Sequence, residues 1–423
     1  MILFLSFLAG GTAFVRANVP GAILSGSSAP VTLNSNATTA TLSNGIVTIV
    51  CQLSDAYLTQ INYTYNNGNG TTTTQMLNGG TDGGMFYIGT GDYGGFAGSA
   101  TTYSVVVNPA TGDANHPAGN YGEIDLVSTS STNGTVDIHF SMLRGSPGFY
   151  VTASWAHRAQ DAAMAQGESR TNIYAGSIFN WMSVDPGRNK VMAVNPNNTS
   201  IPVPGAPVEC YLWTSGIYQG LYDDKYKYSA DFSDQQYGAT PGPHQVWGWS
   251  SVGTGKLNVG MWDVSASLEY HNCGPMKREN MCHIGTTILN VLDGDHYAEG
   301  LDANFTAGEV WNKVYGPYFV YCNNVSAGMT DPYQASQALY NDALAQGVAE
   351  ASGSVSASGS AVGATAWPYG WFYYNNAYGN YTQASGRGTV TGRIVVSDSG
   401  NPLASGSNLY VGVVEQPNTS VGV

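Results

Sequence analysis

The sequence is poor in charge, above all in positive charge. Charged residues make up 10% of the 423 residues, and Lys plus Arg number 14 against 28 Asp plus Glu. The formal net charge of −14 makes nucleic acid and anionic membrane surfaces poor partners. An anionic ligand would need a local basic cluster to overcome this acidic field.

Several other features are missing. Beyond the N-terminal residues, no stretch is long and apolar enough to span a bilayer, so we expect no membrane association. No CxxC or His–Cys cluster indicates zinc. No EF-hand-like or compact Asp-rich loop indicates calcium. Long helical patterns rich in Glu, Lys and Leu are also absent, which disfavours a mainly helical protein.

What the chain has in abundance is typical of β-structure. It contains 54 Gly and 28 Tyr, and Thr and Val are frequent. Alternating or apolar runs separated by Gly, Asn and Asp turns continue from about Asn18 to Asn324. The clearest predicted strands are 45–51, 105–107, 136–140 and 318–322, with turns at Asn67-Gly68, 113–115 and Asp293-Gly294. This regular spacing predicts an all-β protein with a large β-sandwich.

The sequence divides into four parts. Residues 1–17 are typical of a secretory signal peptide, so we expect a secreted, extracellular protein. Residues 18–330 form the predicted sandwich. Residues 331–384 form a connecting segment, with a helix that starts near Asp331 and is capped by Gly347, followed by Ser/Gly-rich and aromatic stretches. Residues 385–423 begin a further β-domain that is too short to be complete, which suggests a truncated chain.

Cysteines and glycosylation sequons fit an oxidising compartment. With five cysteines, one or two disulfides are expected, and Cys273 and Cys282 are the nearest pair, although spacing does not fix the pairing. Asn-x-Ser/Thr sequons make the chain a candidate glycoprotein; they include Asn36, Asn62, Asn133, Asn198 and Asn304.

Four segments carry unusual combinations of basic, aromatic and Gly-Pro residues. The first is the run from Tyr222 to Ser229, in which Lys225 and Lys227 alternate with tyrosines. The second contains Gly274-Pro275 and Lys277-Arg278, and the third is Gly294-Asp-His296-Tyr297. The fourth runs from Trp311 through Gly316-Pro317 to Tyr321, and Arg170 lies upstream of all four.

In order and separation these segments resemble rhamnogalacturonan lyases of polysaccharide lyase family 4. The resemblance covers 167–321 well and 387–396 more weakly. It implies a catalytic β-super-sandwich followed by the start of a fibronectin-III-like domain. It also implies a pectic polysaccharide, rhamnogalacturonan I, as substrate.

The resemblance also implies roles for single residues. Lys225 falls on the catalytic base, His296 on the catalytic acid and Arg170 on a substrate-binding arginine. Lys277, Tyr226 and Tyr297 fall in substrate-binding segments. This chain departs from one pattern of the family, which has a second arginine where Tyr174 stands and tyrosines where Leu289 and Val291 stand.

The chemistry of such a lyase sets what these residues must do. A base removes the C5 proton of the uronate, an acid protonates the leaving O4, and positive charge offsets the carboxylate. We expect that this chemistry requires no cofactor, and the sequence leaves open whether the protein binds a structural calcium ion. A lysine with an ordinary pKa near ~10.4 is a poor base at neutral pH. If 222–228 forms one strand, Lys227 shares the face of Lys225 and lowers its pKa, whereas Asp223 on that face raises it.

Two other functions stay open. The departures at Tyr174, Leu289 and Val291 would also fit a non-catalytic carbohydrate-binding or surface protein that retains the lyase fold. A glycoside hydrolase would need paired carboxylates, and no pair stands out in the sequence. We expect Trp247, Trp249 and Trp262 to be core residues more than sugar platforms. We expect the protein to be a monomer.

Overall fold

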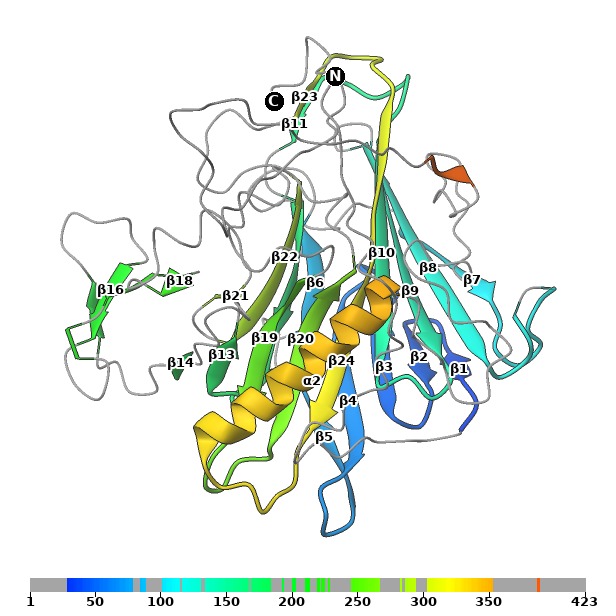
Figure 1. The fold of residues 1–423 in the computed structure, drawn as a ribbon. Helices are drawn as coiled ribbons and strands as arrows, with labels where there is room; N and C mark the ends of the chain where they lie inside the picture. Colours follow the sequence, from blue (N-terminus) through cyan, green and yellow to red (C-terminus); the bar gives the residue numbers. More distant parts are fainter. Residues whose placement is uncertain are drawn as a thin grey trace, which may run out of the picture.

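A computed structural model shows two large antiparallel sheets with a helix packed on the outside (Figure 1). It describes residues 29–78, 84–88, 101–114, 116–130, 134–166, 169–183, 192–193, 200–202, 210–213, 219–220, 222–224, 227–228, 245–266, 282–283, 286–293, 303–352 and 386–388. The signal-peptide prediction for 1–17 and the further β-domain from 389 onward lie outside these residues.

The first sheet has nine strands, in the order β1-β2-β3-β4-β6-β12-β22-β21, with β5 paired to β4. Their bounds are β1 Thr32–Ser35, β2 Thr39–Ser43, β3 Val47–Gln52, β4 Leu58–Asn66, β5 Thr71–Gln75, β6 Met85–Ile88, β12 Ser169–Tyr174, β21 Cys282–His283 and β22 Thr287–Asp293. Residues alternate between buried and half-buried along β3, as expected for a strand with one face in the core. The predicted turn at Asn67-Gly68 joins β4 to β5, with Gly68 at a positive φ of 94°.

The second sheet also has nine strands, in the order β14-β13-β19-β20-β24-β10-β9-β8-β7. Their bounds are β7 Thr101–Val107, β8 Tyr121–Ser130, β9 Gly134–Leu143, β10 Gly148–His157, β13 Trp181–Ser183, β14 Met192–Ala193, β19 Gln245–Ser251, β20 Val259–Ser265 and β24 Trp311–Asn324. Strands β9, β10 and β20 are buried along their whole length, so both faces of the sheet are covered there. On β9, Ile138 and Phe140 enter the core between the sheets, and Asp137 and His139 therefore lie on the opposite, outer face.

Two smaller sheets complete the β-structure. Strands β11 (Met164–Gln166) and β23 (Ala303–Phe305) form one pair. The other small sheet has the order β15-β16-β17-β18, with bounds Ser200–Pro202, Cys210–Trp213, Tyr222–Asp224 and Lys227–Tyr228. This second small sheet lies to the side of the sandwich, beyond β13 and β14 (Figure 1).

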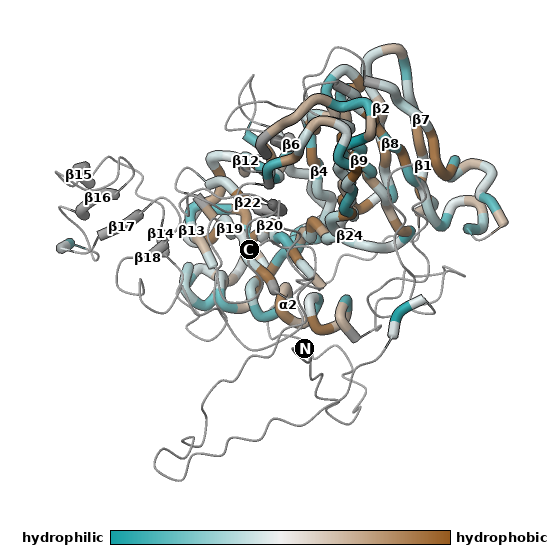
Figure 2. The backbone as a smooth tube through the Cα atoms, turned by 90° about the horizontal axis from the view of Figure 1, so that it is seen from above, coloured by the Kyte–Doolittle hydropathy of each residue, from teal (hydrophilic) through white to brown (hydrophobic). Residues whose placement is uncertain are grey.

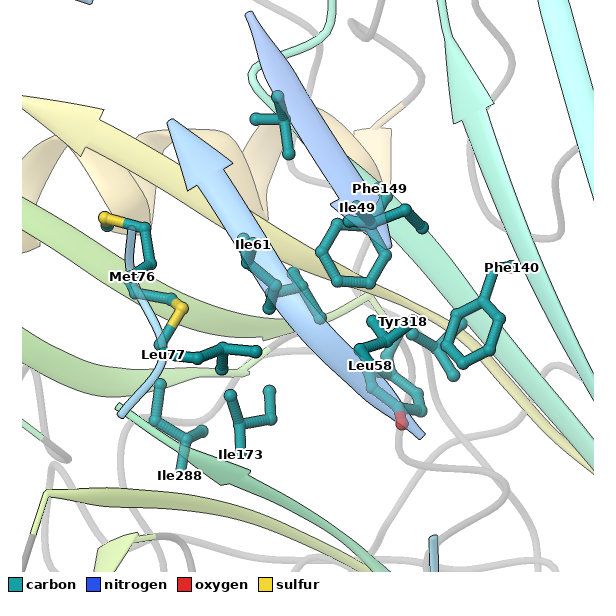
Figure 3. Packing of buried hydrophobic residues seen from close by; sticks show 14 of the residues in the cluster. Ile49, Leu58, Ile61, Met76, Leu77, Phe140, Phe149, Ile173, Ile288 and Tyr318 are labelled. Carbon is teal, nitrogen blue, oxygen red and sulfur yellow. The ribbon is translucent and has the colours of Figure 1, made fainter. Parts of the chain in front are cut away.

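The main core lies between the two large sheets. Residues from the first sheet, such as Ile49, Ile61 and Ile288, belong to the same buried cluster as Phe140 and Tyr318 of the second (Figure 3). The prediction of an all-β sandwich is confirmed, and the four predicted strands fall in β3, β7, β9 and β24.

The helix α2 (Pro332–Ser352) lies on the outer side of β19, β20 and β24, so helix, second sheet and first sheet form three layers (Figure 2). Leu339, Tyr340 and Ala343 pack there with Trp262, and the Tyr340 hydroxyl donates to the Val246 carbonyl at 2.9 Å. The sequence places this helix in a segment that connects two domains. In the structure it packs on the sandwich through residues from Ala335 to Glu350. Within the described residues, no helix combines the length and apolarity that a membrane crossing requires.

The predicted cap at Gly347 is wrong, because α2 continues to Ser352. A glycine inside a helix costs about 1 kcal/mol relative to alanine. Contacts beyond Gly347 offset this cost: the buried Glu350 accepts hydrogen bonds from the Tyr150 hydroxyl at 3.0 Å and from Gln346 Nε2 at 2.8 Å.

The cysteine expectation also needs correction. Cys51, Cys282 and Cys322 are free thiols, all fully buried. Cys282 therefore does not pair with Cys273, its nearest neighbour in the sequence, and the expectation of one or two disulfides narrows to at most one, because only Cys210 and Cys273 are left. The side chain of Cys210 and all of Cys273 lie outside what the structure describes, so a Cys210–Cys273 disulfide is not tested.

Candidate site around Arg170 on strands β12 and β22

Arg170 is the one predicted site residue that the structure describes. Lys225, Tyr226, Lys277, His296 and Tyr297 lie outside the described residues, so their predicted roles stay predictions. Arg170 is half-buried on β12, in the interior of the first sheet between β6 and β22.

Alternation along β12 sets the direction of the Arg170 side chain. The Thr171 hydroxyl is hydrogen-bonded to the Tyr318 hydroxyl of the facing sheet, and Ile173 belongs to the core. Arg170 and Tyr174 therefore lie on the opposite face of the sheet, away from the core. A guanidinium there can bind a carboxylate through two parallel hydrogen bonds.

Strand β22 brings distant positions to the same place. Its register pairs Arg170 with Val291, Asn172 with Leu289 and Tyr174 with Thr287. Arg170, Tyr174, Leu289 and Val291 are the positions that the family resemblance groups around one substrate. Far apart in sequence, they stand on two hydrogen-bonded strands. Leu289 is fully buried, so it offers neither a polar atom nor an open ring face to a sugar.

A β-bulge lies beside Arg170. Ser169 pairs with Asp293 and Arg170 with Val291, which leaves one extra residue in β22. Bulges re-aim side chains and are frequent next to active sites. β22 ends at Asp293, three residues before His296.

The segment around Lys225 differs from the single strand that the sequence suggests. β17 ends at Asp224 and β18 begins at Lys227, and these two residues are antiparallel partners, as are Asp223 and Tyr228. The described residues of 222–228 therefore belong to two strands, and the prediction that Asp223 and Lys227 share a face of one strand is wrong. Lys225 itself lies outside the described residues. Lys227 on β18 is instead the direct antiparallel partner of Asp224 on the neighbouring strand β17.

The three tryptophans are core residues, as predicted, with Trp247, Trp249 and Trp262 all fully buried. Two of them also hold β22 from the core side. The indole of Trp247 donates to the Leu289 carbonyl at 2.8 Å, and that of Trp249 donates to the Thr287 carbonyl at 2.9 Å. The strand that carries half of the candidate site is thus fixed to the second sheet.

Sequence reasoning missed a buried acid beneath this strand. Asp263 on β20 is fully buried and accepts hydrogen bonds from Asn290 Nδ2 at 2.9 Å and from the Ser265 hydroxyl at 3.1 Å. Burial raises the pKa of Asp263 to about 8, although both hydrogen bonds act to lower it. The signal available in the sequence was an aspartate between apolar residues in the strand Val259–Ser265.

Comparisons with known proteins add little to this geometry. No protein-family model matches the chain, and no curated protein matches it. Among solved structures, a TPR-domain containing protein from Parabacteroides distasonis is similar over 69% of this chain, at 10% identity and a TM-score of 0.36. The match spans 48% of that protein, and at this score it supports no functional argument.

Proposed function

We propose that this protein is a secreted rhamnogalacturonan endolyase. It cleaves the bond between L-rhamnose and D-galacturonate in rhamnogalacturonan I by β-elimination. The supporting observation is the pairing of β12 with β22, which brings Arg170 and Tyr174 beside Leu289 and Val291. One pattern of the resembled family groups these positions around the substrate. The five residues from Val291 to His296 span at most about 18 Å, so the chain permits His296 to reach the same sugar.

Each residue has a defined task in this proposal. Arg170 binds the uronate carboxylate and offsets the charge that develops when the C5 proton leaves. Lys225 takes that proton, and the electron pair of the C5–H bond forms the C4–C5 double bond. The C4–O4 bond breaks, and His296 donates a proton to the leaving oxygen. The products are a 4,5-unsaturated uronate and a shortened chain that ends in rhamnose.

Incubation with rhamnogalacturonan I tests this proposal. The expected result is a rise in ultraviolet absorbance from the unsaturated uronate together with falling polymer length. Lys225→Ala and His296→Ala should each reduce kcat by about 10²–10⁴-fold. Arg170→Lys should raise KM and lower kcat, because lysine keeps the charge and loses the paired donors.

Lys256→Ala is the matched control. This exposed lysine on the β19–β20 turn reaches only the Ile178 carbonyl at 3.4 Å, so its loss should leave turnover unchanged. Shortening of the polymer without the ultraviolet signal would disprove β-elimination and indicate hydrolysis.

A second candidate is a non-catalytic carbohydrate-binding protein with the same fold. It is favoured by Leu289, whose buried aliphatic side chain stands where the resemblance places a tyrosine. This function predicts that rhamnogalacturonan I binds without forming product, and that Lys225→Ala binds it as tightly as the unaltered chain. Product formation by the unaltered chain would eliminate this candidate.

A further inference from the structure

A row of polar residues crosses four strands on the outer face of the second sheet. The registers place Ser104 of β7 opposite Asp125 of β8, Asp125 opposite His139 of β9, and His139 opposite Thr152 of β10. The neighbouring residues Ile124, Ile138, Phe140 and Val151 face the core, so the whole row lies on the side away from the first sheet.

His139 is the centre of this row and is held by two carboxylates. Its Nδ1 lies 2.6 Å from Glu123 Oε1, and its Nε2 lies 3.1 Å from Asp137 Oδ1. Glu123 Oε2 also accepts a hydrogen bond from the Tyr121 hydroxyl at 2.5 Å. Glu123, Asp137 and His139 are all at least 95% buried. The imidazole of His139 thus contacts the buried carboxylates of Glu123 and Asp137, and the carboxylate of Asp125 stands on the neighbouring strand, opposite His139.

The donor atoms converge. One ligand atom each from Asp125, Asp137 and His139 can be chosen so that all lie within 4.8 Å of one another. Two ligands that are each about 2.1 Å from one ion are separated by roughly 3.0–3.4 Å, close to the Asp137–His139 distance. Glu123 on Nδ1 is then the carboxylate that orients a metal-binding histidine through its other ring nitrogen.

Thr152 provides an independent indication. Its hydroxyl is buried, with the residue 1% exposed, and finds no hydrogen-bond partner among the residues that the structure describes. It stands directly opposite His139 on the same face. A buried hydroxyl without a partner is costly, and a water molecule bound to an ion at this site would satisfy it.

We propose that Asp125, Asp137 and His139 form a binding site for a divalent transition-metal cation, with Glu123 orienting the histidine and Thr152 holding a metal-bound water. Zinc suits one imidazole and two carboxylates. Calcium prefers six to eight oxygen ligands and fits this set poorly. A cation that binds His139 Nε2 replaces the proton held there, which leaves to solvent. Local sequence spacing does not indicate such a site, because Asp125 and His139 lie on different strands.

The site has a route to solvent and a structural consequence. Asp125 is half-buried, and its partner Ser104, which donates a hydrogen bond to Asp125 Oδ1, is exposed on the edge strand β7. An ion bound to β8 and β9 would stabilise the sheet next to this edge. The metal site is separate from Arg170, which lies on the first sheet.

Equilibrium dialysis of the untagged, metal-stripped chain against Zn²⁺, with the bound metal counted by mass spectrometry, tests the proposal. We expect one equivalent bound, at least ten times more tightly than Ca²⁺, and a thermal midpoint raised by Zn²⁺ and restored by chelator. Co²⁺ should give the visible absorption of a site with nitrogen and oxygen ligands. Asp125→Asn should weaken Zn²⁺ binding at least tenfold, and Thr152→Val should weaken it by a smaller factor.

Asp55→Asn, which alters another half-buried aspartate in the turn between β3 and β4, is the matched control and should bind as the unaltered chain does. Circular dichroism checks that each variant is folded. If Asp125→Asn fails to fold, Thr152→Val and the Co²⁺ spectrum decide. Substoichiometric Zn²⁺ in the unaltered chain, or binding unchanged in the folded variants, would overturn the proposal.

Discussion

At the scale of single residues, the buried carboxyl of Asp263 makes the stability of the sandwich depend on pH. Its pKa of about 8 in the folded chain compares with about 3.9 for an exposed aspartate. At pH 7 it is mostly protonated. Next to it, Asn290 Oδ1 finds no partner among the described residues, and a neutral, protonated carboxyl could donate to it.

Asp263→Asn should therefore flatten the pH dependence of stability. Between about pH 4 and pH 8 the unfolded chain loses the Asp263 proton while the folded chain keeps it. The free energy of unfolding thus falls as pH rises through this window and levels off above it. The difference between the unaltered chain and the variant should change by a few kcal/mol, on the order of 1.4 kcal/mol per pKa unit. Urea unfolding from pH 4 to pH 9 measures it. A constant difference would contradict the raised pKa.

At the scale of elements, α2 depends on its first turn. Asp331 precedes the helix, and its Oδ1 accepts a hydrogen bond from the backbone N–H of Gln334 at 2.8 Å. Pro332 occupies the first helical position, where its missing N–H costs nothing. This arrangement fixes where the helix starts over the outer face of β19, β20 and β24.

Removing this cap should destabilise the protein. We expect Asp331→Ala to lower the free energy of unfolding by about 1 kcal/mol, because one backbone N–H loses its acceptor. Asp331→Asn is the control and should cost much less, since asparagine is also a good cap. Chemical denaturation followed by circular dichroism gives both values. Equal losses in the two variants would indicate that charge, and not the hydrogen bond, is responsible.

At the scale of the whole molecule, side chains of the second sheet donate hydrogen bonds to backbone carbonyls of the first sheet. Trp247 of β19 reaches across the core and donates to the carbonyl of Leu289 on β22. Trp247→Phe should lower the free energy of unfolding by about 2–3 kcal/mol, through a lost buried hydrogen bond and lost volume. Trp181→Phe, at a half-buried position on β13, should cost clearly less. Thermal and urea unfolding compare the two variants.

The two-sheet plan was predictable because apolar residues recur at every second position on short runs such as 45–51 and 136–140, which indicates which residues face the core between the sheets. The pairing of individual strands and the length of helix α2 were not predictable. The sequence did not show that Asp224 and Lys227 are partners across a hairpin, because the Lys-Tyr alternation around them also fits one strand. It did not show that helix α2 passes Gly347, because contacts with Tyr150 decide that. The convergence of Asp125, Asp137 and His139 depends on the pairing of β8 with β9, which local patterns do not specify.

The rates at which the free cysteines of the core react with a thiol reagent can show the order in which parts of the sandwich unfold. Cys51 lies in β3, Cys282 in the two-residue edge strand β21, and Cys322 in the centre of the second sheet. Burial raises the pKa of all three thiols, so a thiol reagent can modify them only when their surroundings open. Modification timed by peptide mass spectrometry should reach Cys282 first, because an edge strand separates most easily. Simultaneous modification of all three would mean that both sheets part in a single event.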